Sequence, residues 1–422
     1  MKKKNSLFFY LFLSLVSTTL LAQKPQQFTS GLTPEKVGVS SERLSRVETL
    51  ISQKIAEKRI PGAVVFAARH GQIVMNKAFG MNDIEANKPL KNNDIFRMMS
   101  MSKAITSIAV MMLYEEGKFN LDDPISKFIP AFKNSQILDS VNPADSSYTA
   151  HPAKKEITIR HLLTHTAGIP YQNKIYEKAK IPFYFSVKPE KLSETIPRLA
   201  ALPKMHEPGE KFTYGLNTDV LGYFVEIVSG MPFDKFLKQR IFEPLQMNDT
   251  GFYVDEAKKD RLVKVYQEVG VEAGISPRPK NEWTEYPLTG AKTYFSGGAG
   301  LTSTAQDYAK ICQLMLNNGV FNNKRLLSRK TVELMTMNQI NELTVRDGTN
   351  KFGLGFEIFT GEGITKLPVS EGAYGWGGMY YTHYMIDPKE DFIMVVLFQV
   401  FPTKGWGIEK QVQQLLYQSI ID

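Results

Sequence analysis

A pattern of helix and hairpin signals occurs at both ends of the chain in opposite order, and it is the strongest constraint on the fold. At the first end, residues 40–58 place apolar side chains at helical spacing, after serines that can cap a helix start. Two β-rich runs, 63–69 and 72–80, follow on either side of His70-Gly71. This end therefore predicts a helix followed by a β-hairpin.

The other end of the chain mirrors that order. Runs 379–386 and 392–399 flank a polar turn and predict a second hairpin, and 406–421 has the spacing of a closing helix. A helix with a hairpin at each end fits one antiparallel sheet built from both termini. We therefore predict the α/β class, of the α+β type, with helices flanking this sheet.

The middle of the chain, by contrast, carries mostly helical and loop signals. We expect a sheet lobe from about 34–95 and 291–422, and an inserted, mostly helical lobe from about 96–290. A ligand cleft between two such lobes is the default expectation. Loops at 131–155, 170–195 and 270–295 are expected to shape specificity there.

The first 22 residues resemble an export signal. Lys2-Lys3-Lys4 precede an apolar stretch, 7–16, that is shorter than the roughly 20 residues of a spanning helix. Small residues follow, and cleavage after Ala22 would leave 23–422 as the mature domain; the alternative is an uncleaved anchor. We expect a periplasmic or secreted protein without stable membrane insertion.

Charge and cysteine content narrow the function classes further. The net charge of +8 includes those three lysines, and no basic run follows them, so nucleic-acid binding is not expected. Cys312 is the single cysteine, which excludes an intramolecular disulfide and a cysteine metal cluster.

Ser100-Met-Ser-Lys103 is the first candidate for chemistry. It opens a run with helical spacing, so Ser100 would lie in the first turn, with its hydroxyl at the positive end of the helix dipole. Lys103, three residues on, would share its face of the helix. The alternative is a helix cap with a solvated lysine, because Ser-x-x-Lys also occurs by chance.

Several blocks in colinear order resemble the serine β-lactamase and penicillin-binding-protein superfamily, most closely the class C-like branch with its family VIII carboxylesterases. The resemblance extends from about residue 34 over nearly all of the chain. The blocks are 96–103 with 121–130, 157–169, 213–222 and 297–304. It implies that Ser100 is acylated, that Lys103 transfers protons, and that Tyr214 relays a proton to the leaving group.

The second and third motifs depart from the family pattern. After Tyr214, the substrate-binding candidate Asn217 stands one position later than in Tyr-x-Asn. The third motif, Lys-Thr-Gly in relatives, is matched in position by Trp376-Gly377-Gly378 at the entry to strand 379–386. These three residues are candidates for substrate binding, and the main-chain amides of Ser100 and Met379 for the oxyanion hole. The missing lysine favours neutral esters or amides.

Three histidines are candidate site residues. His161 and His165 are four residues apart, but no third ligand is evident, so packing and capping are favoured over a metal site. His383 alternates with Tyr381 and Met385; it either faces the cleft as a substrate-binding residue or takes a core or surface position. We expect no metal and no cofactor.

The sequence thus predicts an exported serine hydrolase that acts through an acyl-enzyme on ester or amide bonds of small substrates. A β-lactamase and a D-amino-acid peptidase on cell-wall-type peptides share this chemistry and remain alternatives. A non-catalytic, penicillin-binding-like receptor or wall-binding module is the alternative of another class.

Overall fold

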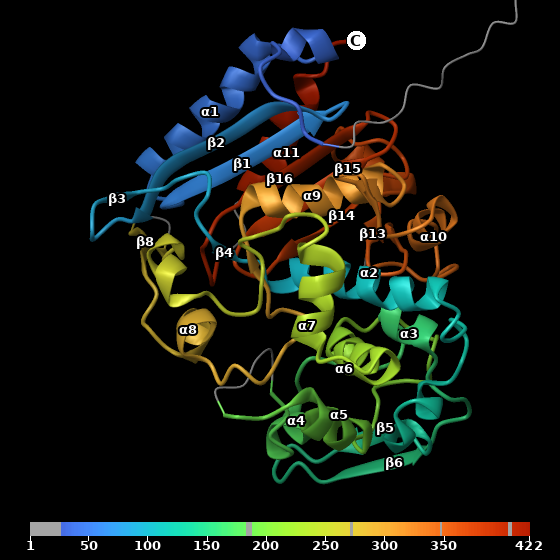
Figure 1. The fold of residues 1–422 in the computed structure, drawn as a ribbon. Helices are drawn as coiled ribbons and strands as arrows, with labels where there is room; N and C mark the ends of the chain where they lie inside the picture. Colours follow the sequence, from blue (N-terminus) through green and yellow to red (C-terminus); the bar gives the residue numbers. More distant parts are fainter. Residues whose placement is uncertain (1–26, 183–187, 271–272, 347, 404–406) are drawn as a thin grey trace, which may run out of the picture.

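The computed structural model describes residues 27–182, 188–270, 273–346, 348–403 and 407–422. The predicted signal segment 1–22 lies outside these residues. An eight-stranded antiparallel sheet has the order β12-β13-β14-β15-β16-β1-β2-β3 (Figure 1). Its strands are β1 (Gly62–Arg69), β2 (Gln72–Asp83), β3 (Lys88–Pro89), β12 (Lys351–Phe352), β13 (Glu357–Ile358), β14 (Tyr374–Gly378), β15 (Thr382–Asp387) and β16 (Phe392–Leu397).

The two chain ends meet at the centre of this sheet. β16 pairs antiparallel with β1, from Val64 opposite Leu397 to Arg69 opposite Phe392. The predicted sheet built from both termini is therefore confirmed. The first hairpin turns at His70 and Gly71, whose positive φ angles of 51° and 72° suit a two-residue turn between twisted strands.

Helices cover both faces of the sheet. Along β1, Val64 and Phe66 pack in the core shared with α2 (Ser102–Glu115) and α9 (Ala305–Leu316). Val65 and Ala67 point the other way and pack with α1 (Ser41–Ala56) and α11 (Ile408–Gln418). Strands buried on both faces are apolar throughout, which is why β1 and β16 are almost unbroken hydrophobic runs.

The predicted helical lobe lies on the α2 side of the sheet (Figure 1). Two hairpins were not predicted from the sequence, because their strands are short: β5–β6 lies in this lobe, whereas β7–β8 packs against the sheet, where Tyr266 bridges to Val400. Among the described residues, no helix combines the length and apolarity needed to cross a membrane. The elements are α3 (Ile159–Leu163), α4 (Lys174–Lys178), α5 (Leu192–Ala200), α6 (Asn217–Ser229), α7 (Phe233–Leu237), α8 (Glu282–Thr289), β5 (Gln136–Val141), β6 (Tyr148–Pro152), β7 (Tyr266–Gly270) and β8 (Gly274–Pro277).

Four short strands and one helix complete the fold. β4 (Phe96–Arg97), which leads into the Ser100 turn, pairs with β9 (Thr302–Ser303). The others are β10 (Val320–Phe321), β11 (Lys324–Arg325) and α10 (Arg329–Met335).

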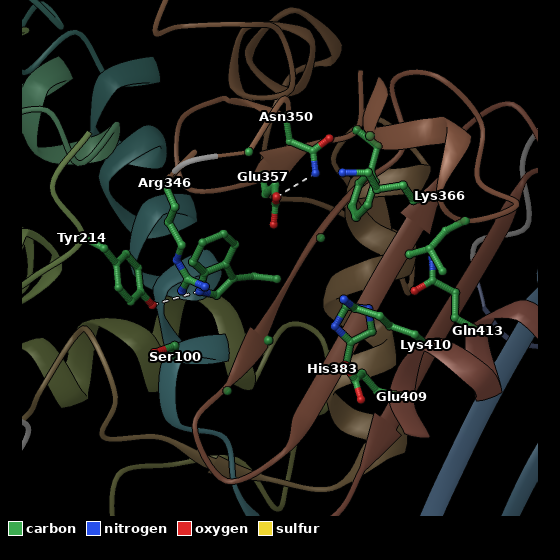
Figure 2. Close-up of a pocket in the computed structure, with 18 of the residues that line it drawn as sticks. Ser100, Tyr214, Arg346, Asn350, Glu357, Lys366, His383, Glu409, Lys410 and Gln413 are labelled. Atoms are coloured by element: carbon green, nitrogen blue, oxygen red, sulfur yellow. Dashed lines mark hydrogen bonds between the residues drawn. The ribbon is translucent and has the colours of Figure 1, made fainter. Parts of the chain in front are cut away.

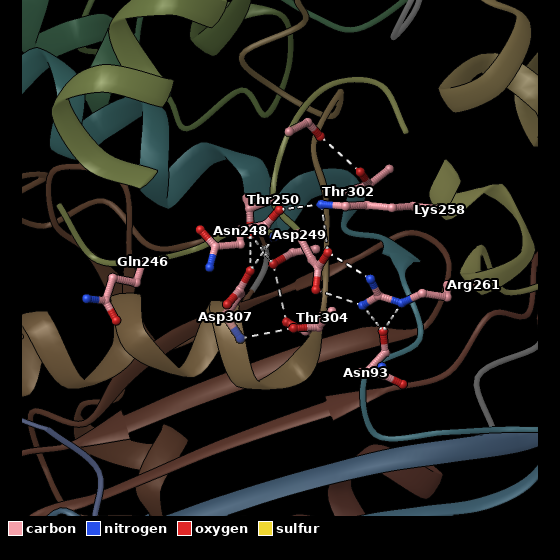
Figure 3. Close-up of polar contacts among 12 residues, drawn as sticks. Asn93, Gln246, Asn248, Asp249, Thr250, Lys258, Arg261, Thr302, Thr304 and Asp307 are labelled. Atoms are coloured by element: carbon pink, nitrogen blue, oxygen red, sulfur yellow. Dashed lines mark hydrogen bonds and ion pairs between the residues drawn. The ribbon is translucent and has the colours of Figure 1, made fainter. Parts of the chain in front are cut away.

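A polar network joins the segment 246–261 to β9 and to the start of α9 (Figure 3). Arg261 forms a two-point ion pair with Asp249 at 2.7 and 2.8 Å and also donates to the Asn93 carbonyl. The Asp249 amide donates to the Asp307 carboxylate on α9 at 2.9 Å. Because Gly251 bridges to Thr302, this network fixes the start of β9, which pairs with β4 just before the Ser100 turn.

Candidate active site

Ser100 lies in a 3-10 turn, Met99–Met101, that runs directly into α2. The α-helix therefore begins at Ser102, two residues later than the motif suggested. Met99, just before the serine, has a positive φ of 50° although it is not glycine, a conformation that costs about 1–3 kcal/mol. Backbone strain of this kind persists where surrounding structure enforces it, and here it presents Ser100 with 8% of its surface exposed.

Lys103 is buried against Ser100, with 3% of its surface exposed. Its Nζ lies 3.3 Å from Ser100 Oγ, 2.5 Å from the Tyr171 hydroxyl and 2.7 Å from the Gly298 carbonyl oxygen. The alternative of a solvated lysine is therefore wrong. Lys103 Nζ thus donates to three oxygens, one of which is the Ser100 hydroxyl.

Two tyrosines flank Lys103, and only one of them was predicted. Lys103 Nζ lies 4.7 Å from the ring centre of Tyr214 and 5.2 Å from that of Tyr171. The Tyr214 hydroxyl accepts a hydrogen bond of 2.9 Å from the Trp376 indole. A donor aimed at this oxygen stabilises negative charge that develops when the phenol proton leaves. Tyr171 belongs to no motif, and only its place in the predicted 170–195 specificity loop pointed to it.

The predicted contact between Asn217 and substrate is wrong in this structure. Asn217 is fully buried at the start of α6, and it does not line the cavity at Ser100. Its amide nitrogen lies 2.9 Å from His165 Nδ1 and donates weakly to the carbonyls of Ile169 and Thr213. The extra residue after Tyr214 places this amide in the first helical turn, where it faces the core instead of the cleft.

The third motif forms a strand of its own. Trp376, Gly377 and Gly378 belong to β14 and Met379 to the turn that follows, whereas the sequence placed the motif at the entry to one longer strand. All four residues line the cavity with Ser100. A Cβ on Gly378 would lie 2.3 Å from the Met98 carbonyl oxygen, so only glycine lets this strand approach the Ser100 turn.

Asp219 lies beneath Lys103 and was missed by the sequence motifs. It is buried on α6, and a Cβ on Gly298 would come within 2.7 Å of its Oδ2, so that glycine leaves the space for the carboxylate. Burial raises the pKa of Asp219 to about 6, although hydrogen bonds from Ser296 and the charge of Lys103 oppose the rise. The carboxylate thus supports the segment whose Gly298 carbonyl holds Lys103.

Arg346 brings a cation to the site that the sequence had not predicted. Its guanidinium lies 5.6 Å from the Tyr214 ring centre and 5.4 Å from that of Trp376, and it lines the cavity beside Ser100. A positive charge therefore lies at the cavity wall on a segment outside the third motif.

One cavity of about 750 Å³ joins these groups to a second set of polar residues. Figure 2 shows Ser100, Tyr214 and Arg346 at one end and His383 at the other, beside residues of α11. His383 therefore lines the cavity, as the substrate-binding assignment requires, but far from the serine and beyond β14. Its role in binding stays a prediction.

The other two candidate histidines, His161 and His165, have structural roles. His161 Nδ1 accepts from the Thr158 amide, closing a capping box at the start of α3, and burial lowers its pKa to about 4. His165 is buried, and its ring centre lies 4.8 Å from that of Tyr214. Burial holds the pKa of His165 well below the usual value. The predicted packing and capping roles of this pair are confirmed.

The comparisons agree with this fold. A family model described as Beta-lactamase matches residues 47–417, so the chain belongs to the beta-lactamase family, and the predicted resemblance is confirmed. The family and fold are those of a hydrolase that acts on ester or amide bonds.

Three proteins illustrate what the chain is similar to. An uncharacterized protein of Mycobacterium tuberculosis strain CDC 1551 is 30% identical over 358 residues, which cover 81% of this chain and 86% of that protein. Esterase EstB of Burkholderia gladioli is 27% identical over 377 residues, which cover 85% of this chain and 91% of that protein. The structure of EstCE1, a hydrolase with promiscuous acyltransferase activity, matches with a TM-score of 0.75 at 27% identity, covering 90% of this chain and 99% of that one.

Proposed function

We propose that this protein is a Ser-x-x-Lys serine hydrolase that cleaves small esters or amides through an acyl-enzyme on Ser100. The observation that carries the proposal is the buried Lys103 Nζ at 3.3 Å from Ser100 Oγ, at the wall of a cavity that also exposes Ser100 to substrate. A nucleophile and a base within hydrogen-bond reach, with the base oriented by further groups, is the arrangement that covalent catalysis needs.

The acylation step uses groups of this chain alone. Lys103, in its amine form, takes the hydroxyl proton as Ser100 Oγ bonds to the substrate carbonyl carbon, and the carbonyl electron pair moves to oxygen. The Ser100 and Met379 amides are the candidate donors to that oxyanion. When the carbonyl re-forms, the bond to the leaving alcohol or amine breaks, and Tyr214 passes the proton to it.

Deacylation repeats these transfers with water as the nucleophile. Water loses a proton to the same base, attacks the ester carbonyl on Ser100, and releases the acid while the proton returns to Ser100 Oγ. Trp376 in place of the family lysine supports neutral substrates, and the similarity to the esterase EstB supports ester cleavage.

The test is covalent labelling of Ser100 by a fluorophosphonate, with hydrolysis of a chromogenic short-chain ester followed in parallel. Ser100→Ala is expected to lose both label and turnover. Ser102→Ala is the matched control, because the Ser102 hydroxyl accepts from the Leu301 amide and does not line the cavity. Turnover that survives Ser100→Ala unchanged would refute the proposal.

A second candidate function, removal of a terminal D-amino acid from cell-wall-type peptides, is favoured by Arg346. A guanidinium at the cavity wall can pair with the terminal carboxylate of such a peptide. Release of D-alanine that falls strongly in Arg346→Ala, while neutral ester turnover stays, would support this peptidase. Equal losses on both substrates would count against it.

Export to the periplasm or medium is also part of the proposal. It is supported by the three lysines and the short apolar stretch near residue 1. Amino-terminal sequencing of protein from fractionated cells tests it: a mature chain that begins at Gln23 is expected, and full-length protein in the cytoplasm would contradict export.

A further inference from the structure

The cavity extends well beyond the groups that perform the chemistry. β13 pairs with β14 only at Tyr374 and Gly375, which leaves the outer edge of the following three residues without a strand partner. Gly377, at this free edge, has no side chain, and a Cβ there would lie 3.6 Å from His383 Nδ1. The cavity therefore passes from Ser100, over the edge of β14, to the space between β15 and α11.

Polar atoms without hydrogen-bond partners gather at that far end. They are Gln413 Nε2 and Glu409 Oε2 on α11, and His383 Nε2 on β15, and all three residues line the cavity. Gln413 is only 1% exposed, so water does not satisfy its amide. Unpartnered buried polar groups cost free energy and are rare in native proteins, so a cluster at one end of a cavity calls for a ligand that completes it.

The three atoms define the chemistry of that ligand. Gln413 Nε2 can only donate and Glu409 Oε2, in a carboxylate, can only accept. Burial lowers the pKa of His383, against the opposing effects of Glu409 and Gln413, which favours a neutral ring with one donor and one acceptor nitrogen. A group that accepts and donates at adjacent atoms would satisfy the site.

We propose that the far end of the cavity is a subsite for an amide group of the substrate, whose carbonyl accepts from Gln413 and whose N–H donates to Glu409. The subsite deepens the proposed function, on which it rests, by naming a substrate class: esters or amides that carry a second amide away from the bond that is cut. A carboxylate end is disfavoured because it would face the Glu409 carboxylate. An alkyl end would leave both atoms unpartnered.

The test compares chromogenic esters of one chain length that end in a carboxamide, a carboxylate or an isopropyl group, in a series of increasing lengths. One series places this end on the acyl side and a second on the alcohol side. At the length that reaches α11, the carboxamide ester is expected to have a kcat/KM about 10-fold above that of its isopropyl counterpart.

Variants of Gln413 and Glu409 test whether the preference for the carboxamide ester comes from the subsite. Gln413→Leu is expected to abolish the carboxamide preference, chiefly through KM, and to leave turnover of the shortest ester unchanged. Gln414→Leu is the matched control, because Gln414 is exposed on the same helix. Glu409→Gln, as a second variant, is expected to admit the carboxylate ester.

Each outcome is decisive. No carboxamide preference in either series, or a preference that survives Gln413→Leu, overturns the subsite, while fluorophosphonate labelling of Ser100 would leave the proposed hydrolase intact. Absence of Ser100 labelling and of all ester turnover would instead overturn the proposed function and the subsite that rests on it.

Discussion

The two ends of the cavity differ in how their polar atoms are satisfied. At the Ser100 end, Lys103 Nζ, the Ser100 hydroxyl and the Tyr214 hydroxyl all have partners within the protein. At the α11 end, Gln413 and Glu409 each hold an unpartnered buried atom. Under the proposed function, the groups that move protons are held in place before substrate arrives, whereas the groups proposed to recognise substrate are left for it to complete.

Removing the amine from the satisfied end is expected to have the largest effect. Lys103→Met should lower kcat for a short-chain ester by about 10³-fold, because the serine loses its base while the cavity keeps its shape. Single-turnover ester hydrolysis measures this. Lys366→Met is the matched control, since Lys366 is exposed at the cavity rim, and it should retain kcat. A Lys103→Met variant with normal kcat would remove Lys103 from the mechanism.

Asp219 is an exception at the Ser100 end of the cavity. Its carboxylate lies beneath Lys103, but its buried Oδ1 has no hydrogen-bond partner. Its pKa of about 6 in the folded protein exceeds the unfolded value of about 4. The stability it contributes is therefore present below pH 4 and is lost as pH rises through 6, a difference of about 3 kcal/mol.

The measurement is chemical denaturation of the wild type and of Asp219→Asn across that range. The free energy of unfolding of the wild type, relative to that of the variant, should fall between pH 4 and pH 6 and then level off. A relative stability that rises with pH would mean that the carboxylate is held in its charged form by Lys103, and that this end is fully satisfied after all.

The two tyrosines sharpen the description of the Ser100 end. Tyr214→Phe is expected to lower kcat about 10²-fold, because it removes the proposed proton relay. Tyr171→Phe removes a hydrogen bond to Lys103 and should cost only about 10-fold. Steady-state kinetics with a good and a poor leaving group separate the roles, since a relay matters most for the poor one. The reverse order of losses would assign the relay to Tyr171.

Local patterns explain what the sequence could predict. Alternating and helical periodicity gave both hairpins, α1 and α11, and the spacing of Ser100 and Lys103 on one helical face gave their contact. These features depend on neighbours within a few residues. The pairing of β1 with β16 followed because a buried strand at each chain end needs a partner.

Long-range loop conformation explains what the sequence could not predict. Tyr171 and Arg346 reach the site from segments without a motif, and no spacing rule places them beside Lys103 or Trp376. Asn217 was misassigned because one extra residue before a helix changes which way a side chain faces. The unpartnered state of Gln413 depends on the packing of α11 against β15, which periodicity does not contain.

The smallest expected effects are changes in the free energy of unfolding, in variants of two buried amides, Asn217 and Gln413. Asn217→Leu removes an amide whose nitrogen lies 2.9 Å from His165 Nδ1 and leaves that buried nitrogen unpaired, so the free energy of unfolding should fall by about 1–3 kcal/mol. Gln413→Leu also replaces a buried amide by an apolar side chain, but it removes an amide nitrogen that has no partner, so stability should stay equal or rise by about 1 kcal/mol. Urea denaturation at one pH gives both values. Opposite signs would show that the α11 end gives up stability for recognition, whereas a loss in Gln413→Leu as large as that in Asn217→Leu would mean that the Gln413 amide is already satisfied within the folded protein.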